Sequence, residues 1–435
     1  MPAPLAAVAL PAWIDPARLF AGGPARHPHA FWLDAGPDAG DGWSWLGIGA
    51  PEADPDVVRE VRSGVTADPE SEWGRFRGGW VGWFGYEYAA ARMQAPASVA
   101  ESAVPQALWL RVDCFVAFDH AAQRAWAVAP LGQEDAFAAQ VHGWAEAEPV
   151  AASAPRQTVA TPRHEPGEYA GLVERCRDAI REGDAYQLCL TTRFSVPHEV
   201  DPLAVHTALR AATPAHHGGI VRSAGVALVS ASPERFLEVE GGILRTRPIK
   251  GTRPRGTDAA TDAALAAELL ASPKERAENV MIVDLMRNDL SRVCADGTVA
   301  VDALLSVESY PAVHQLVSTV SGTLNADASV GDILDATFPA GSMTGAPKLS
   351  AMTILDGLEH APRGVFAGCY GWIGADGALD LAMVIRSVVT HPGGAYVGAG
   401  GGITWGSEAW AEVAEVGIKA RGPLAAMGAV LPSGW

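Results

Sequence analysis

Residues 232–252 read SPERFLEVEGGILRTRPIKGT, and this stretch says most about the fold. Phe236 to Glu240 and Ile243 to Arg247 are short runs typical of strands. The Gly241-Gly242 pair between them is typical of a two-residue hairpin loop. The segment therefore predicts an antiparallel hairpin, and with it a sheet built from chain neighbours.

Two residues that could carry chemistry, Glu234 and Lys250, flank this hairpin. Strict pairing would place Ile249 opposite Glu234, with Lys250 one residue off, but Pro233 and Pro248 disfavour strict pairing there. The pattern predicts that the two side chains are close and leaves their facing open. An amine in apolar surroundings can act as a nucleophile, and a neighbouring carboxyl can protonate a leaving hydroxyl. A salt bridge at the hairpin end is the alternative.

Strand-like and helix-like runs follow one another irregularly along the rest of the chain, without a βαβ rhythm. This favours an α+β fold with large, mostly antiparallel sheets. An Ala-, Pro- and Glu-rich stretch at 145–166 predicts a surface connection between an N-terminal subregion, 1–148, and a C-terminal region, 164–425. We expect strands at 29–34, 43–47, 78–86, 107–118, 125–129, 186–194, 226–231, 366–373, 379–389 and 395–400, and helices at 167–181, 273–293, from about 346, and 408–420.

The composition excludes several classes of protein. The 435 residues include 50 acidic and 32 basic side chains, a net charge of -18, which argues against nucleic acid or an anionic membrane as the main partner. No stretch approaches ~18 uncharged apolar residues, and Met1 to Pro11 lacks the basic start of a signal peptide. The five cysteines form no C-x-x-C pair. A cytoplasmic protein with reduced thiols is the expectation.

Two predicted helices carry glutamates in suggestive positions. In 273–293, Ser272 and Glu275 have the spacing of a capping box, whereas Glu278 lies in line with the apolar stripe and so needs a partner or a metal. In 408–420, four charged residues share one face: Glu408, Glu412, Glu415 and Lys419. Two such carboxylate faces would suit Mg²⁺, which favours a few carboxylates with water and substrate oxygens. A solvated acidic stripe is the alternative for the second helix.

Three further features could bind an anion. Residues 340–345, AGSMTG, precede a predicted helix and could leave backbone N–H groups free for a carboxylate. Residues 398–402, GAGGG, could form a backbone nest. Plain turns are the alternative for both. Arg386 follows the apolar run 382–385, and a buried arginine usually answers a fixed anion, although an internal ion pair remains open.

These stretches, in their order and spacing over most of 165–425, resemble the chorismate-utilising enzymes. The longest is AENVMIVDLMRNDL at 277–290, and 78–86 resembles the other subregion of that family. Anthranilate and isochorismate synthases carry alanine where Lys250 stands, whereas aminodeoxychorismate synthases carry lysine. Residues 341–345 also look like the aminodeoxychorismate version. Component I of aminodeoxychorismate synthase is therefore the most similar branch.

The resemblance implies an anthranilate synthase component I-like fold, in which the sheets pack as a sandwich with helices outside. It implies chorismate as substrate, Mg²⁺ as cofactor and 4-amino-4-deoxychorismate as product, for p-aminobenzoate and folate synthesis. It also implies a glutamine amidotransferase partner that supplies ammonia, since no Cys-His-Glu amidotransferase domain is evident. Anthranilate synthase component I or another chorismate enzyme is the alternative, and a non-enzymatic amino-acid-binding protein is a third reading.

The resemblance also implies roles for single residues. Lys250 would attack C2 of chorismate while Glu234 protonates the departing C4 hydroxyl, and His314 would lie near the reacting ring. Glu278 and Glu415 would be direct metal ligands, with Glu275 and Glu412 alongside. Substrate contacts would come from Thr252, Gly341, Ser342, Thr344, Arg386, Gly400, Gly402 and Lys419.

Three positions depart from the family pattern. Phe366 stands where many relatives have tyrosine, which puts one substrate hydrogen bond in doubt. Cys189 replaces a commoner asparagine. Leu33-Asp34-Ala35 differs from the Leu-Glu-Ser triplet of tryptophan-inhibited relatives, so the candidate amino-acid pocket of the N-terminal subregion is expected to respond weakly to tryptophan.

Overall fold

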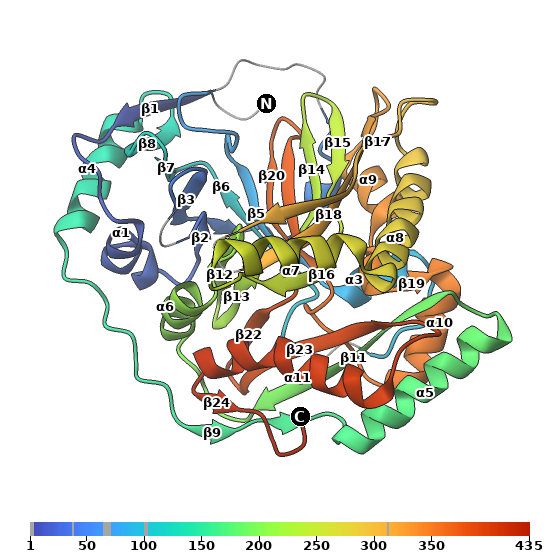
Figure 1. Ribbon diagram of the computed structural model, residues 1–435. Coiled ribbons are helices and arrows are strands. Elements are labelled where there is room, and N and C mark those ends of the chain that lie inside the picture. Colours follow the sequence, from blue (N-terminus) through green and yellow to red (C-terminus); the bar gives the residue numbers. More distant parts are fainter. Residues whose placement is uncertain (1–3, 37–38, 64–70, 100–102, 311–312) are drawn as a thin grey trace.

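The computed structural model describes residues 4–36, 39–63, 71–99, 103–310 and 313–435. Two large antiparallel sheets pack against each other, and helices cover their outer faces (Figure 1). The predicted α+β sandwich with outer helices is therefore confirmed.

The first sheet has 12 strands among the described residues. In spatial order they are β1 (Leu5–Ala9), β8 (Arg124–Pro130), β7 (Phe115–Asp119), β3 (Trp43–Ile48), β2 (Ala30–Asp34), β12 (His217–Ser223), β13 (Val226–Ser232), β22 (Ser387–His391), β23 (Gly394–Ile403), β11 (Gln187–Val196) and β10 (Thr161–Pro162), with β19 (Gly345–Ala346) on β11.

The second sheet has 10 strands in the same part of the chain. Their order is β16 (Ile249–Pro254), β18 (Val313–Thr323), β15 (Ile243–Thr246), β14 (Arg235–Glu240), β21 (Leu379–Met383), β20 (Cys369–Gly374), β5 (Gly79–Phe84), β6 (Ala107–Val112) and β4 (Ala50–Pro51), with β17 (Ala300–Ser309) also on β18. A small parallel pair joins β24 (Ala429–Val430) to β9 (Thr158–Val159).

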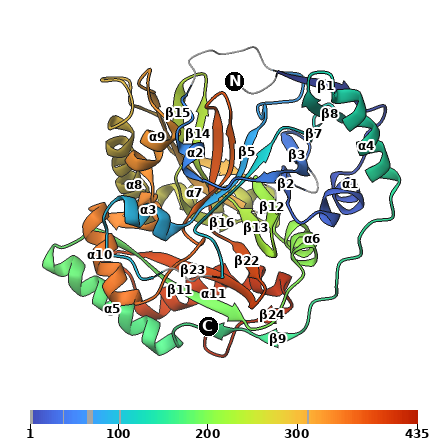
Figure 2. The ribbon, with the colours of Figure 1, turned by 180° about the vertical axis from the view of Figure 1, so that it is seen from behind.

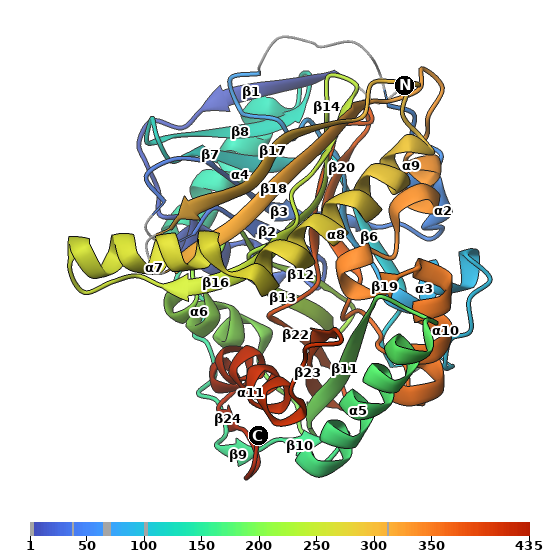
Figure 3. The ribbon, with the colours of Figure 1, turned by 45° about the vertical axis from the view of Figure 1, so that its right-hand side comes forward.

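The helices lie mostly outside the two sheets, and Figure 3 shows α8 beside β16 with α11 below them. They are α1 (Pro16–Gly22), α2 (Asp56–Arg59), α3 (Tyr86–Arg92), α4 (Glu134–Glu146), α5 (Pro166–Glu182), α6 (Pro202–Ala212), α7 (Ala259–Ala271), α8 (Pro273–Ser291), α9 (Val330–Thr337), α10 (Lys348–Glu359) and α11 (Ala409–Ala426), with short 3₁₀ turns η1 (Pro24–Arg26) and η2 (Gly341–Met343).

Alternate side chains of a strand contribute to different layers of the core. In β20, Tyr370 and Trp372 join the core between the sheets, whereas Cys369 and Ile373 face the helices outside the second sheet. Strands of both sheets alternate in this way because successive side chains point to opposite faces. Both faces of each sheet are therefore apolar near its middle, where the strands are buried, whereas strands near the edges such as β1, β16 and β17 are half-buried or exposed.

Two predicted strands prove to be two strands each. The run 107–118 divides into β6 and β7, which belong to different sheets. The run 379–389 divides into β21 and β22, again in different sheets, and Arg386 at the division has φ 51°, outside the strand region. Both sheets also combine strands from the two predicted subregions, 1–148 and 164–425.

Within the described residues, no helix is both long enough and apolar enough to cross a membrane. The predicted hairpin at 236–247 is confirmed, with Glu240 paired to Ile243. The predicted helices correspond to α5, α8, α10 and α11, although α11 continues six residues beyond the expected end, to Ala426.

Candidate active site

The strand that carries Lys250 pairs with a different neighbour from the one that the sequence suggested. The hairpin partner of β14 ends at Thr246, and β16, which carries Lys250, pairs instead with β18 through Ile249 and Val317. Glu234 and Lys250 therefore do not face each other across one hairpin, which answers the question of facing that the sequence left open. The two side chains, both among the described residues, form no ion pair or hydrogen bond with each other, but the Lys250 ammonium acts to lower the pKa of the Glu234 carboxyl, which supports the predicted proximity.

Glu234 directly precedes β14, and its carboxyl has a raised pKa. Burial raises the pKa of its carboxyl to about 7, against the opposing effects of Lys250, of the Ser342 hydroxyl and of Lys419. The Ser342 Oγ donates to Glu234 Oε1 over 3.3 Å. A carboxyl that is half protonated near neutral pH can act as a general acid, which the predicted role requires.

The glutamates of α8 lie beside Lys250. Ser272 Oγ accepts from the Glu275 backbone N–H over 3.5 Å, as the predicted cap requires, but the Glu275 carboxylate turns to Arg253, with 3.5 Å between Oε1 and a guanidinium nitrogen. Glu278 is nearly buried, and burial raises the pKa of its carboxyl, against Lys250 and Lys274. Its Oε1 is buried without a hydrogen-bond partner.

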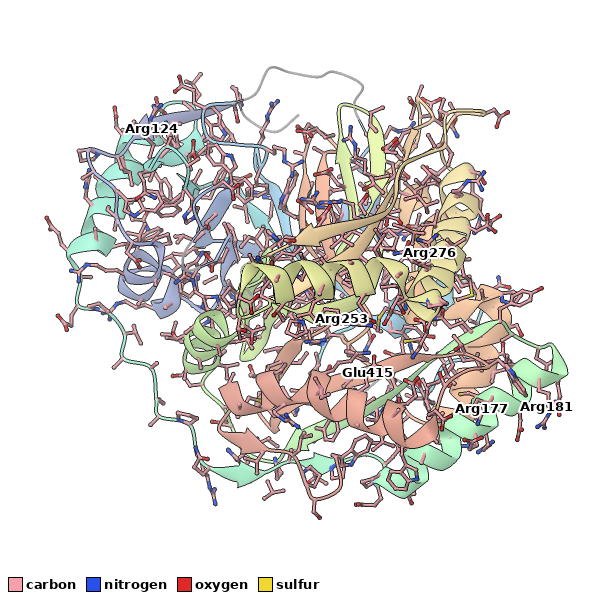
Figure 4. All side chains as sticks on the ribbon, in the orientation of Figure 1. Arg124, Arg177, Arg181, Arg253, Arg276 and Glu415 are labelled. Atoms are coloured by element: carbon pink, nitrogen blue, oxygen red, sulfur yellow. The ribbon has the colours of Figure 1, made fainter. Side chains whose placement is uncertain are left out.

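The glutamates of α11 face the same space. Glu412 is 4% exposed, which excludes the solvated acidic stripe for this residue, and burial raises its pKa. Burial would also raise the pKa of Glu415, but Lys419, 2.7 Å away, holds it below its ordinary value. Figure 4 shows Glu415 on the side of α11 that faces β16 and Arg253. Glu408 is exposed and caps the helix outside the site.

Lys274 joins the two carboxylate faces, and the sequence patterns did not single it out. Its Nζ lies 4.0 Å from Glu278 Oε1 and 3.9 Å from Glu412 Oε1. Burial lowers the pKa of Lys274, but the four glutamates Glu278, Glu412, Glu415 and Glu275 together raise it. Glu278 and Glu412 therefore both lie within 4.0 Å of this cationic side chain, and Glu275 and Glu415 act on it electrostatically.

The donor set fits a hard divalent cation. All four side chains offer carboxylate oxygens, which Mg²⁺ prefers, and the buried Glu278 Oε1 has no hydrogen-bond partner. Among the described residues, no three His, Cys, Asp or Glu side chains form a ready-made metal cluster. The two faces thus offer ligands of the right type, and binding would require them to draw together with water or substrate oxygens.

Of the two glycine-rich segments, 398–402 differs from its predicted form, and 341–343 forms a 3₁₀ turn that uses part of its N–H groups. In η2, the Met343 and Thr344 N–H groups already donate to Ala340 and Gly341 carbonyls, and the Thr344 hydroxyl donates to Ala340. The run 398–402 is a strand paired with β11 and not a nest. Its glycines let other side chains approach closely, as the Lys419 Nζ shows by donating to the Gly400 carbonyl over 2.8 Å.

Gly401 and Gly402 have such neighbours on either side. A Cβ on Gly401 would lie 2.9 Å from Glu412 Oε2. A Cβ on Gly402 would lie 2.6 Å from Gln187 Nε2 and 3.6 Å from Lys250 Nζ. Side chains larger than hydrogen would therefore displace the groups that the site brings together.

Arg386 belongs to the site, whereas His314 does not touch its other members. Burial lowers the pKa of Arg386, opposed by Glu415, and its guanidinium forms no ion pair in the described part of the chain. The ring nitrogens of His314 lie 2.8 Å from Ser309 Oγ and 2.9 Å from Asp262 Oδ1, so both are engaged beside α7. Thr252 is exposed on β16 beyond the bulge that follows Lys250.

The comparisons with known proteins agree with this geometry. Residues 44–425 match the family described as chorismate binding enzyme. The chain is 42% identical over 368 residues to an aminodeoxychorismate synthase of Streptomyces pristinaespiralis, covering 81% of this chain and 51% of that protein. It is 38% identical over 375 residues to anthranilate synthase component 1 of Streptomyces coelicolor, covering 81% and 73%.

The chain spans about half the length of the Streptomyces aminodeoxychorismate synthases that it matches. Among solved structures, anthranilate synthase component I from Streptococcus pneumoniae superposes with a TM-score of 0.72 and 29% identity, over 97% of this chain and 92% of that chain. A family match over most of the sequence, with the same fold, shows that this chain belongs to the chorismate-binding enzyme family.

Proposed function

We propose that this protein forms 4-amino-4-deoxychorismate from chorismate and ammonia. The observation that carries the proposal is the Glu234 carboxyl, whose pKa burial raises to about 7 and on which the Lys250 ammonium acts electrostatically. The 42% identity to an aminodeoxychorismate synthase supports it further. The 38% identity to an anthranilate synthase component supports the alternative of 2-amination.

The reaction would proceed in two substitutions. The Lys250 amine bonds to C2, the ring double bonds shift, and the C4–oxygen bond breaks as the Glu234 proton passes to the departing hydroxyl, which leaves as water. Ammonia then bonds to C4, the double bonds shift back, and the C2–nitrogen bond to Lys250 breaks. The amine proton lost in the first half passes to solvent or to the Glu234 carboxylate.

The remaining residues would bind and orient the substrate. The chain has a net charge of -18, so a dianionic substrate needs local positive charges in order to bind. Lys419 and Arg386 would supply these charges. Glu278 and Glu415, with Glu275 and Glu412 beside them, would hold Mg²⁺. A bound Mg²⁺ would neutralise these carboxylates and fix a substrate carboxylate by direct coordination.

Ammonia would come from a separate glutamine amidotransferase. Glutaminases of that class need a reactive thiolate. Burial raises the pKa of all five thiols of this chain, Cys114, Cys176, Cys189, Cys294 and Cys369. Such thiols are poor nucleophiles, which supports a partner as the source of ammonia. A cytoplasmic location stays a prediction.

The test is product analysis with the purified chain, chorismate, Mg²⁺ and an ammonium salt at mildly alkaline pH. We expect 4-amino-4-deoxychorismate by liquid chromatography and mass spectrometry, and no turnover when glutamine replaces ammonium. Formation of anthranilate with pyruvate would instead establish the alternative. Glutamine-dependent turnover by the single chain would refute the need for a partner.

A further inference from the structure

Gln187, the first residue of β11, is the most unusual buried polar residue near the site. Its side chain is fully buried, and neither Oε1 nor Nε2 has a hydrogen-bond partner. Burying an amide without partners forfeits its hydrogen bonds to water and gains nothing in return. Native proteins leave few such groups, and an unpaired one usually marks a place where a water or a ligand binds.

The surroundings of Gln187 identify that place. The missing Cβ of Gly402 would lie 2.6 Å from Gln187 Nε2 and 3.6 Å from Lys250 Nζ, so the amide and the amine flank one small space. The backbone of Gln187 pairs with Ala346, directly after the 341–345 segment. Ser342 of that segment donates to Glu234. The amide therefore lies beside the glycine strand and near the lysine, and the backbone of Gln187 adjoins the segment that contacts the proton donor.

The orientation of the amide decides what it can bind. As placed, Gln187 Nε2 and Lys250 Nζ, both N–H donors, lie near the same point beside Gly402. A 180° turn of the amide exchanges the positions of Oε1 and Nε2 and places Oε1 toward the amine. The turn breaks no hydrogen bond, because neither atom has a partner. Oε1 can then accept an N–H of Lys250, and Nε2 is left to donate to a third group.

We infer that Gln187 is a positioning residue that holds the Lys250 amine through Oε1 and donates from Nε2 to a carboxylate oxygen of the bound substrate. The inference rests on the proposed function. The carboxylate in question is the one on C1, next to the carbon that Lys250 attacks. By holding both partners, the amide aligns the amine lone pair with C2, and the substrate supplies the missing hydrogen bond.

The decisive variant is Gln187→Met, which keeps the length of the side chain and removes both polar atoms. We expect its melting temperature without ligand to stay close to that of the wild type, because the single hydrogen bond lost to Lys250 is offset by the removal of a buried, unpaired Nε2. The rate at which chorismate adds to the protein without ammonia, measured by intact-protein mass spectrometry, should fall about 100-fold, as expected for a misaligned nucleophile. Chorismate affinity should also fall.

Gln187→Glu sharpens the test. Its carboxylate would still accept from Lys250 but would repel the substrate carboxylate, so KM should rise more than kcat falls. The matched control is Gln106→Met, since Gln106 Oε1 is likewise buried without a partner but lies on the far edge of the second sheet, next to β6. This control should leave adduct formation and KM unchanged.

The inference is overturned if Gln187→Met forms the adduct at the wild-type rate. It is equally overturned if the variant loses melting temperature while chorismate affinity and adduct rate, measured on the folded fraction, stay intact, since Gln187 would then be structural. Failure of the proposed function looks different: the wild type itself would form no adduct. Binding then decides, because equal chorismate-induced thermal shifts in wild type and Gln187→Met would still refute the contact.

Discussion

Two buried polar clusters flank the same strand, β11, and they differ in how completely their groups are paired. Behind the site, Arg363 donates to both carboxylate oxygens of Glu359, at 2.7 and 2.9 Å, and to the carbonyls of Met343 and Cys189. Glu359 also accepts from the Thr191 N–H. At the site, the Gln187 amide and Glu278 Oε1 have no hydrogen-bond partner.

The paired cluster also ties the N-terminal helix α3 to the rest of the molecule. Glu87 accepts from the N–H groups of Arg363 and Gly364, and the Arg363 guanidinium lies 4.4 Å from the ring centre of Tyr86. Figure 2 shows α3 beside α10 in this region. One cluster thus fixes the backbone of β11 and the 341–345 segment, and the other leaves donors and acceptors for a ligand. Substitutions should affect folding in the first and chemistry in the second.

The largest effect is expected at Lys250. Lys250→Ala should keep the melting temperature and chorismate binding but lose adduct formation and at least about 1,000-fold in turnover, since several kcal/mol of barrier depend on the covalent route at ~1.4 kcal/mol per tenfold. Intact-protein mass spectrometry with chorismate and no ammonia measures the adduct. Lys250→Arg keeps the charge without a comparable nucleophile and should be equally inactive. Wild-type product from Lys250→Ala would make the lysine a mere electrostatic contact.

In the paired cluster, Arg363→Met should unfold the protein more easily. It leaves the buried Glu359 carboxylate without its partner, which typically costs about 3–5 kcal/mol in the free energy of unfolding. Denaturant titration measures this. Arg181→Met is the control, because the Arg181–Asp178 pair is exposed at the outer end of α5 (Figure 4) and should contribute under about 1 kcal/mol. Equal losses in the two variants would contradict the contrast.

The next prediction concerns metal binding at the site, where Glu278 Oε1 has no hydrogen-bond partner. Glu278→Gln removes a charge at nearly constant volume, so we expect the Kd for Mg²⁺ to rise about 10- to 100-fold, and exhaustive chelation to abolish turnover in the wild type. Isothermal titration calorimetry gives the Kd directly. Glu408→Gln, at the exposed cap of α11, should leave it unchanged. Unaltered Mg²⁺ affinity in Glu278→Gln would reassign that residue as structural.

The sequence predicted local elements well and their partners less well. Helix α8 begins at Pro273, directly after its Ser272 cap, and the 241–242 loop forms the expected hairpin, because caps and turns depend on neighbouring residues. The division at Arg386 depends on which sheet each half joins, and no local signal shows that. The same holds for Lys250, since the pairing of β16 with β18 joins segments far apart in the chain.

The site shows the same division between local and long-range information. The spacing of the four glutamates placed them on two helical faces, and both faces do meet around Lys274. Neither Lys274 nor the unpaired state of Gln187 could be read from spacing, because each depends on contacts across the fold. His314 was expected near the reacting ring. In the structure, Ser309 and Asp262 contact its two ring nitrogens.

A smaller effect is expected on the pH dependence of stability, from the carboxyls of Glu234, just before β14, and of Asp380 on the neighbouring β21. Burial raises the pKa of Glu234 from 4.5 to about 7, so its folded-state proton stabilises the protein at low pH, and this contribution is lost as pH rises from about 4.5 to 7. Glu234→Gln should therefore gain melting temperature relative to the wild type as pH rises through that range, by roughly 2 °C.

Asp380 is the internal control for this pH effect. Burial opposes its ionisation, but His217, Arg235 and Arg75 hold the pKa of this carboxyl well below its ordinary value. Its charge is therefore stabilising above the unfolded pKa, and Asp380→Asn should lose stability throughout neutral pH. Melting curves between pH 5 and 8 measure both variants. A Glu234→Gln difference that stays flat over this range would contradict the raised pKa.

The smallest effect is expected from tryptophan, at a third polar cluster where β2 of the N-terminal subregion meets α6 of the C-terminal region. Asp34 and Arg210 form an ion pair at 2.6 Å, and Arg210 lies 4.9 Å from the ring centre of Trp32. The cavity beside them measures about 10 Å³, enough for roughly one water and far too small for an indole.

Because Asp34 and Arg210 already pair with each other there, an amino acid would have to displace this ion pair in order to bind. We expect 1 mM tryptophan to change neither the initial rate nor the melting temperature measurably, with phenylalanine as a control for non-specific effects. A micromolar inhibition constant would show that this pair opens readily. The cluster would then belong with the ligand-binding site, and not with the internally paired network around Arg363.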